Sequence, residues 1–371
     1  MTQYKSIRQG QTETFFKDIV HTSAVWTYNS DGTVTKDGDI IEGQVAAVYI
    51  DQKGLKQTAV INYQEDLIAD KKVIWKYEDG KTAKEETYEN GELQWNYRSF
   101  FPDGSPHTER KYDEIKQEGS NTVYYENGKK KLEEAYKNGV KHGPYKIYYE
   151  NGNLKMEGAF LFGKLEGMVK VYYEDGRTKV EGIYIKGKEE GVHKLYDRSG
   201  NVVMKETYSA GVKQGPVTKY YENSSLKMTG VFENGKEEGD FTLYYESGRQ
   251  KLTGCFKEGK EHGPYKVFYE SGELKMEGEY VNGLEEGYYR LYYKSGVVKV
   301  EGTHNNGKEE GLFRMYYPSG KIHVEQFFAD GKTHGLYTAY YESGKVKQEA
   351  KFENGVQTES VKYDEQGKKE E

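Results

Sequence analysis

The chain repeats one 24-residue unit, and this period constrains its fold more than any other feature of the sequence. The unit is clearest over residues 265–288, YKVFYESGELKMEGEYVNGLEEGY. Glycines recur at 24-residue steps in three sets, one of which runs from Gly139 to Gly355. Self-similarity at a fixed period is the signature of a repeat architecture. The sequence therefore predicts a structure that grows by stacking repeats, although a length of 371 residues would otherwise suggest two or more domains.

Each repeat reads as two antiparallel strands. Asn-Gly, Asp-Gly and Ser-Gly pairs suit hairpin turns that need positive φ, which glycine adopts without steric strain. We expect one strand over residues 145–150 and the next over 154–160, followed by an Asn-Gly-Lys-x-x-Gly segment that leads into the next repeat. Glycines such as Gly158 are expected to interrupt the second strand at a bend or a close backbone approach. The prediction is an all-β ladder of hairpins.

The regularity divides the chain into three segments. Residues 1–70 are expected to form an irregular N-terminal β cap, with strand-like stretches VWTY, QVAAVYI and TAVINY. Residues 71–356 hold the regular array. Residues 357–371 read as a polar C-terminal tail, because terminal segments without apolar residues have little to hold them to a sheet.

Composition excludes several classes of partner. The net charge is −7, from 54 basic and 61 acidic residues that alternate finely along the chain. A nucleic-acid-binding protein usually has a basic stripe, and a membrane-surface protein a cluster of Lys and Arg. Neither pattern is present, so we expect no nucleic-acid partner and no membrane binding. No stretch approaches the roughly 20 apolar residues of a membrane-spanning helix.

The first twenty residues lack the apolar core of a signal peptide, and the single cysteine, Cys255, fits a reducing compartment. These features favour the cytoplasm. An exported protein whose signal had been removed would show the same sequence.

Stacked repeats turn each position into a ladder of side chains, and one ladder is aromatic and surface-facing. Side chains alternate between the two faces of a strand, so this ladder shares a face with lysines such as Lys155, which we expect to lie near glutamates such as Glu157. The rings have two interpretations: they stack to stiffen the sheet, or they form a partner-binding surface, since tyrosine is enriched at interfaces. The candidate binding residues are Tyr148, Tyr172, Tyr196, Tyr220, Tyr244, Phe268, Tyr292, Tyr316 and Tyr340.

No catalytic or metal site is predicted. His142, His262 and His334 share one position of the repeat, but successive repeats lie on the order of 9–10 Å apart, too far for one ion. We interpret this position as a solvated turn residue. Pairs such as Glu309-Glu310 recur in many repeats, whereas an active site is normally unique. We therefore expect neither an enzyme nor a cofactor.

The repeat resembles the MORN repeat family, and in particular its bacterial MORN-2 variant. The pattern of an aromatic residue, Asn-Gly, x-x-Gly and paired aromatics before Ser-Gly is matched from Tyr280 to Gly296, and the family's His-Gly appears at His142-Gly143. The resemblance implies an elongated single-layer antiparallel sheet, a β-hairpin solenoid. Family members serve as scaffolds and oligomerisation modules, and bacterial relatives are labelled antitoxin-like.

We therefore expect a repeat scaffold that binds a protein partner along its aromatic surface, or one that binds a second copy of itself as a homodimer. The alternative is a glycan-binding or cell-envelope-binding repeat protein, because hairpin repeats with paired tyrosines are also similar to cell-wall-binding repeats. Those repeats typically place Trp in the ligand cage, whereas Trp26, Trp75 and Trp95 all precede the regular array here.

Overall fold

The structure, a computed structural model, describes residues 6–9, 12–16, 25–28, 34–37, 42–50, 56–64, 67–68, 72–89, 92–113 and 116–370. These residues form strands and turns, with no helix among them. The described part of the chain accordingly contains no helix long and apolar enough to cross a membrane. It divides into two compact units, Met1–Lys188 and Glu189–Glu371, which are described in turn.

Unit 1 is a ladder in which almost every strand pairs antiparallel with the next strand along the chain. The three strand-like stretches predicted before residue 70 are confirmed as β3, β5 and β6, and the pairing of β6 with β8 joins the early strands to the repeats. Strands β3 and β4 form a separate pair. The strands of this unit are β1 Ser6–Gln9, β2 Thr12–Phe16, β3 Val25–Tyr28, β4 Val34–Asp37, β5 Glu42–Ile50, β6 Lys56–Gln64, β7 Leu67–Ile68, β8 Lys72–Tyr77, β9 Thr82–Glu89, β10 Glu92–Phe100, β11 Pro106–Asp113, β12 Lys116–Tyr124, β13 Lys130–Lys137, β14 Val140–Tyr148, β15 Leu154–Leu161, β16 Lys164–Leu165, β17 Gly167–Tyr172 and β18 Thr178–Ile185.

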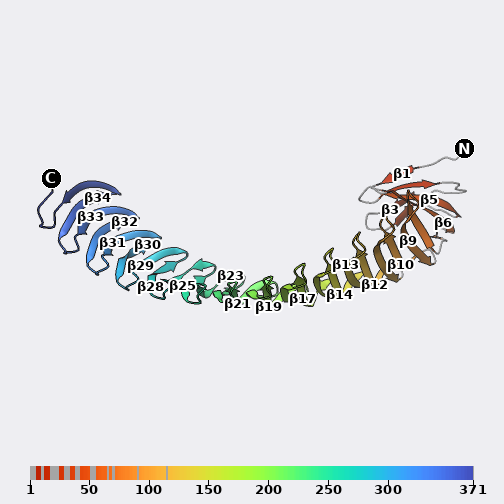
Figure 1. The fold of residues 1–371 in the computed structure, drawn as a ribbon. Coiled ribbons are helices and arrows are strands. Elements are labelled where there is room, and N and C mark those ends of the chain that lie inside the picture. The colour runs from red at the N-terminus through yellow and green to blue at the C-terminus, as the bar shows by residue number, and fades with distance from the viewer. Residues whose placement is uncertain are drawn as a thin grey trace. The chain divides into compact units, whose positions relative to one another are not determined.

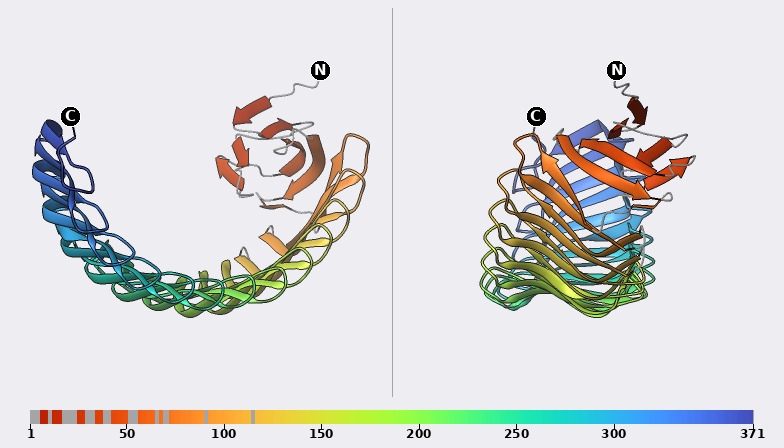
Figure 2. Two further views of the ribbon diagram at one scale, coloured as in Figure 1. Left: turned by 60° about the vertical axis from the view of Figure 1, so that its left-hand side comes forward. Right: turned by 90° about the vertical axis from the view of Figure 1, so that its right-hand side faces the viewer.

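Unit 2 continues the same pattern of consecutive antiparallel hairpins, visible in Figure 1 from β28 to β34. Figure 2 shows its loops gathered along the two edges of its sheet. The strands are β19 Lys188–Tyr196, β20 Val202–Ser209, β21 Val212–Tyr220, β22 Leu226–Glu233, β23 Lys236–Glu237, β24 Gly239–Tyr244, β25 Gln250–Lys257, β26 Lys260–Glu261, β27 Gly263–Phe268, β28 Leu274–Val281, β29 Leu284–Tyr292, β30 Val298–Asn305, β31 Lys308–Tyr316, β32 Ile322–Ala329, β33 Lys332–Tyr340, β34 Val346–Glu353 and β35 Val356–Lys362.

Two kinds of turn alternate along the array. The Asn-Gly turns have two residues at positive φ, as at Asn138 (53°) and Gly139 (78°), which is the type I′ geometry of a two-residue hairpin. The Asp/Asn/Ser-Gly turns have three loop residues and end on a single left-handed residue such as Gly152. Ser224 takes this last position once, with φ 65° and the same N–H···O bond to Tyr221 that glycine makes elsewhere.

The first strand of most repeats begins earlier than predicted from the bounds 145–150. In the structure β14 begins at Val140 and passes through Gly143, which has φ 103° and sits in a bulge against β13. The Asn-Gly-x-x-x-Gly segment is therefore a hairpin turn followed by strand. The prediction missed this because a glycine with positive φ inside a strand reads locally as a second turn.

The strand glycines mark a close approach, as predicted, but they do not interrupt the second strand. A Cβ built on Gly158 would lie 2.7 Å from Cε1 of Tyr145, so only glycine leaves room for this ring on the neighbouring strand. Tyr145 is thereby 4% exposed in a sheet that has no second layer over this face. We call the face that carries Tyr145 and Gly158 the glycine face. Its rings contact one another along the sheet, as in the 4.8 Å approach of Tyr145 and Phe160.

Both edges of the array are hydrogen-bonded from repeat to repeat. At the Asn-Gly edge, the N–H of Glu258 donates to Oε2 of Glu238 at 2.8 Å, and the next N–H, of Gly259, donates to the Glu237 carbonyl. At the other edge, the hydroxyl of Tyr245 donates to the carbonyl of Phe268 at 2.7 Å. These bonds let a thin sheet satisfy turn donors that would otherwise depend on water.

At the C-terminal end, β35 covers the first part of the segment predicted as a tail. It pairs antiparallel with β34 from Val356 to Lys362, and Tyr363 makes a further bridge to Lys369. The last turn with two residues at positive φ is at Asn354 and Gly355.

Candidate interaction surface

The face opposite the glycine face carries the predicted aromatic ladder, and we call it the tyrosine face. Along each long strand it presents three residues in order, and strand β33 shows them as Leu336, Thr338 and Tyr340. Each position forms a row across neighbouring strands: an outermost row, a central row of basic residues or threonines, and the aromatic row. All nine candidate residues lie in this third row and are half-buried, from Tyr148 in unit 1 to Tyr340 in unit 2.

Most of these tyrosines are fixed by a carboxylate of the preceding repeat. The hydroxyl of Tyr172 donates to Oε1 of Glu157 at 2.6 Å, and that of Tyr316 donates to Oε1 of Glu301 at 2.7 Å. Tyr148 makes the same bond to Glu133. Burial, and then the hydrogen-bonded carboxylate, raises the pKa of each of these three phenols to about 12. The rings are therefore neutral and held in one orientation.

The glutamates of this arrangement also bind the central basic row in the later repeats. Nε of Arg314 lies 2.9 Å from Oε1 of Glu325, whose other oxygen accepts the hydroxyl of Tyr340. The Arg314 guanidinium, and then the Tyr340 hydroxyl, hold the pKa of Glu325 below its usual range. A cation, a carboxylate and a phenol are thus linked across three strands.

One stretch of the tyrosine face lacks these carboxylates. Lys205, Thr229 and Thr253 stand where the other repeats have glutamate, and the aromatic residues that follow them are Tyr220, Tyr244 and Phe268. Between Lys205 and Lys266 the central row is uncharged, because it consists there of four threonines in cross-strand register, Thr218, Thr229, Thr242 and Thr253. This part of the tyrosine face carries threonine hydroxyls and aromatic rings, and its central row contains no carboxylate.

The predicted contact of Lys155 with Glu157 is wrong. The ammonium of Lys155 lies 5.4 Å from the ring centroid of Tyr149, and Lys179, Lys227, Lys251, Lys275 and Lys299 lie in the same way over the equivalent tyrosines. The register shifts between Ile147 and Tyr148, so that the lysine falls at a bulge and leaves the row of the glutamate. A strict period of two could not anticipate this shift.

The outermost row of the tyrosine face was not predicted as a binding feature. It exposes Met168 and Ile183 in unit 1, which are paired across strands and 48% and 40% accessible. In unit 2 it exposes Phe327 and Leu336, at 44% and 50%. The signal in the sequence is the residue that directly follows the third glycine of each repeat, as in Gly167-Met168 and Gly335-Leu336.

The position shared by His142, His262 and His334 is solvent-exposed at His334, as predicted for a solvated turn residue. In most other repeats its glutamate accepts the N–H of the next Asn-Gly turn, as Glu310 does from Asp330 at 2.9 Å. His142 and His262 are half-buried, and within the described chain their Nδ1 atoms have no hydrogen-bond partner. No group of three or more His, Cys, Asp or Glu side chains among the described residues is placed to hold a metal ion.

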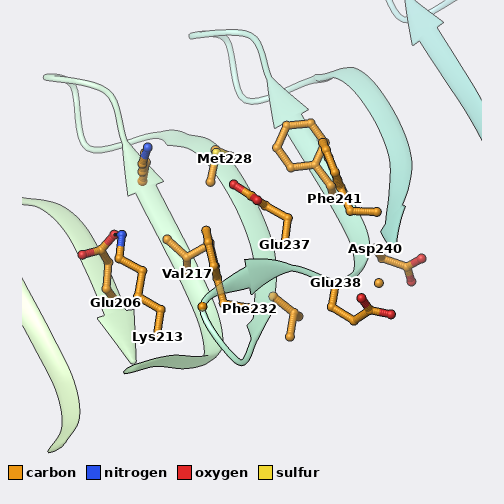
Figure 3. A pocket seen from close by; sticks show the side chains of 15 residues that line it. Glu206, Lys213, Val217, Met228, Phe232, Glu237, Glu238, Asp240 and Phe241 are labelled. Carbon is orange, nitrogen blue, oxygen red and sulfur yellow. Dashed lines mark hydrogen bonds and ion pairs between the residues drawn. The ribbon is translucent and has the colours of Figure 1, made fainter. Parts of the chain in front are cut away.

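A hollow of about 410 Å³ opens on the glycine face of unit 2 (Figure 3). Its floor is apolar and includes Val217, Met228, Phe232 and Phe241. On one side Lys213 forms a 2.6 Å ion pair with Glu206 and lies over the Phe232 ring. Other charged residues of its lining are Lys219, Glu237, Glu238 and Asp240.

Comparison with known families agrees with the geometry of the hairpins. The model of a MORN repeat variant matches residues 69–90, 117–138, 141–160, 189–210, 261–282, 285–306, 309–330 and 333–354. The chain is a MORN-repeat protein. In these MORN repeats, each 22-residue match ends on the residue before a glycine, as at Asn138, Ala210 and Asp330, so that one match such as 333–354 spans one pair of strands.

No curated protein sequence matches the chain. Similar solved structures include a crystal structure of TcdB2-TccC3-Cdc42 (11% identity, 99% of this chain and 26% of that chain, TM-score 0.15). A Photorhabdus luminescens Tc holotoxin pore gives 12% identity over 93% of this chain and 18% of that chain, with a TM-score of 0.13. A crystal structure of TcdB2-TccC3 without its hypervariable C-terminal region gives 11% identity over 95% of this chain and 22% of that chain, with a TM-score of 0.16. The MORN-repeat chain thus spans about a quarter or less of the length of each of these chains.

Proposed function

We propose that this MORN-repeat protein is a non-enzymatic scaffold that binds a protein partner through the tyrosine face. The observation that carries the proposal is the row of exposed apolar side chains beside the aromatic row, with Leu336 half-exposed two strand positions from Thr338 and four from Tyr340. Apolar side chains that line up on a solvent-facing sheet favour association, because burying them against a partner removes apolar surface from water.

The fixed tyrosines support the same function. A ring whose hydroxyl is already bound to a carboxylate, as Tyr316 is to Glu301, loses little side-chain freedom when a partner covers it. Tyrosine also contributes large contact area with few rotatable bonds. We infer that the Tyr–Glu pairs both stiffen the sheet and preorganise the binding surface, so the two interpretations of the ladder are compatible.

The test uses two variants that each replace one exposed apolar side chain. Leu336→Ser removes an apolar side chain from the tyrosine face, and Met315→Ser removes one of 38% exposure from the glycine face, two residues after Phe313. Each protein serves as bait in a host lysate, and captured proteins are quantified by mass spectrometry. A protein lost with Leu336→Ser and retained with Met315→Ser supports the proposal. Equal capture by all three baits contradicts it.

The alternative partner for the exposed apolar row of the tyrosine face is a second copy of the chain. Sedimentation velocity over a range of concentrations distinguishes it, because a homodimer through the tyrosine face would dissociate on dilution and more readily with Leu336→Ser. An antitoxin-like role would require that the captured protein be a toxin whose activity the bait suppresses.

Glycan binding is a second candidate, favoured by the uncharged row of Thr218, Thr229, Thr242 and Thr253 beside Tyr220 and Tyr244. Trp75 gives it no support, because that ring is 1% exposed and its Nε1–H donates to Glu86 at 2.7 Å. A glycan array probed with the wild type and with Tyr244→Ala separates this candidate. Retention that depends on Tyr244 would support it, and no retention would exclude it.

A further inference from the structure

The hollow on the glycine face lies in one of the two repeats, those of Val169 and Val217, that have valine where most other repeats have a ring. Two repeats further on, Tyr265 covers Gly278, with its hydroxyl 2.9 Å from the place a Cβ would take, and the hydroxyl donates to Oε1 of Glu285 at 2.9 Å. The residues at the same positions around the hollow are Gly230 for Gly278, Phe232 for Tyr280 and Glu237 for Glu285. Only the tyrosine is missing, because Val217 stands in its place.

The space that this ring would fill is open. A Cβ on Gly230 would lie 3.6 Å from both Val217 Cγ1 and Phe241 Cδ2, an ordinary contact and not the sub-3.0 Å overlap found at Gly278. The resulting hollow, about 410 Å³, exceeds the roughly 150 Å³ that suffices to hold benzene in a protein. Met228, Phe232, Phe241 and Phe256 supply apolar surface for a ring.

The hydrogen-bond acceptor of the missing hydroxyl is still present. Within the described residues the carboxylate of Glu237 accepts no hydrogen bond, whereas its counterpart Glu285 is occupied by Tyr265. Figure 3 shows Glu237 on the side of the hollow lined by Met228 and Phe241. Lys213 does not compete for Glu237, because it is paired with Glu206.

We propose that this hollow binds an aromatic ring bearing a hydroxyl, in the position that tyrosine occupies in the repeat of Tyr265, with the hydroxyl donating to Glu237. On a protein partner the occupant is a tyrosine side chain that reaches the hollow from the glycine face, so this site is independent of binding through the tyrosine face. Rings that carry a carboxylate or phosphate are disfavoured, because Glu237, Glu238 and Asp240 would repel them.

The experiment titrates p-cresol, the side chain of tyrosine as a free molecule, into protein labelled at its methionine methyl groups. The NMR signal of Met228, in the hollow, should shift saturably, while that of Met276, its counterpart beside the filled site, should stay in place. Because p-cresol replaces the partner, its binding does not depend on the tyrosine face, and failure of this site is distinguishable from failure of the proposed function.

Two variants separate the ring from the hydrogen bond. Val217→Tyr fills the hollow from within and should abolish the Met228 shift, with an unchanged Met276 signal reporting an intact sheet. Glu237→Leu keeps the hollow but should weaken p-cresol by about tenfold and leave toluene binding unchanged. A Met228 signal that does not move at high p-cresol, a shift that persists in Val217→Tyr, or equal affinity for toluene and p-cresol in the wild type would overturn the proposal.

Discussion

The phenol of Tyr265 donates to the carboxylate of Glu285, twenty residues later in the chain, while its ring covers Gly278. Burial, and then the Glu285 carboxylate, holds the pKa of this phenol well above its usual range. The same three positions recur with one member changed: Leu165 replaces the glutamate opposite Tyr145, and Val217 replaces the tyrosine opposite Glu237. Comparing these repeats therefore shows what changes when the tyrosine or the glutamate is absent.

Leu165→Glu should give the Tyr145 hydroxyl the acceptor it lacks. That hydroxyl is buried and has no hydrogen-bond partner among the described residues, which is a costly state for a polar group. We expect a gain of about 1 kcal/mol in the free energy of unfolding, measured by urea denaturation. The same substitution in a Tyr145→Phe background is the control. An equal gain in both backgrounds would show that the hydroxyl is not involved.

Gly302→Ala should destabilise the array, because the added Cβ would lie 2.5 Å from the Phe313 ring and either the ring or the strand must move. Overpacking of this kind typically costs about 1–3 kcal/mol. Gly254→Ala is the matched control, since the nearest atom to its Cβ is 3.7 Å away. Urea melts of the two variants should differ by at least about 1 kcal/mol. Equal midpoints would contradict the close approach.

Ser224→Gly should stabilise unit 2. Ser224 is held at φ 65°, a left-handed conformation that disfavours a residue with a Cβ by roughly 1 kcal/mol, and glycine occupies the equivalent position at Gly248. The converse substitution, Gly248→Ser, should destabilise by a similar amount. Thermal melting reports both, and shifts of the same sign in the two variants would be inconsistent with this account.

The array should lose stability between pH 10 and pH 12. Tyr148, Tyr172 and Tyr316 have pKa values raised to about 12 in the folded chain, compared with 10.0 for an ordinary phenol. Between these values the unfolded chain releases protons that the folded chain keeps, so stability is full below pH 10 and falls as pH rises toward 12. Melting temperatures across this range should fall less steeply in Tyr316→Phe. An unchanged slope would indicate an ordinary pKa.

The period of the glycines was sufficient to predict the hairpins, the order of the strands and the tyrosine ladder, because identical local patterns stack in only one way. The features that the sequence pattern could not predict depend on contacts between repeats. The bulge that moves Lys155 from Glu157 to the Tyr149 ring involves the pairing of two strands and has no local signature. The hollow at Val217 could not be predicted, because valine is an ordinary strand residue. Only its position next to Gly230 and Glu237 in the structure shows that a ring is missing there.

The most direct test of the central claim compares two sets of adjacent tyrosines. One bait carries Tyr244, Tyr292 and Tyr316 changed to Ser, which removes rings from the tyrosine face. The matched bait carries Tyr245, Tyr293 and Tyr317 changed to Ser, which removes the edge rings that bond to backbone carbonyls of the next repeat. Circular dichroism confirms that both remain folded. The account predicts that a partner captured by the wild type is lost with the first bait and retained with the second. Retention by the first, or equal loss from both, would contradict binding through the tyrosine face.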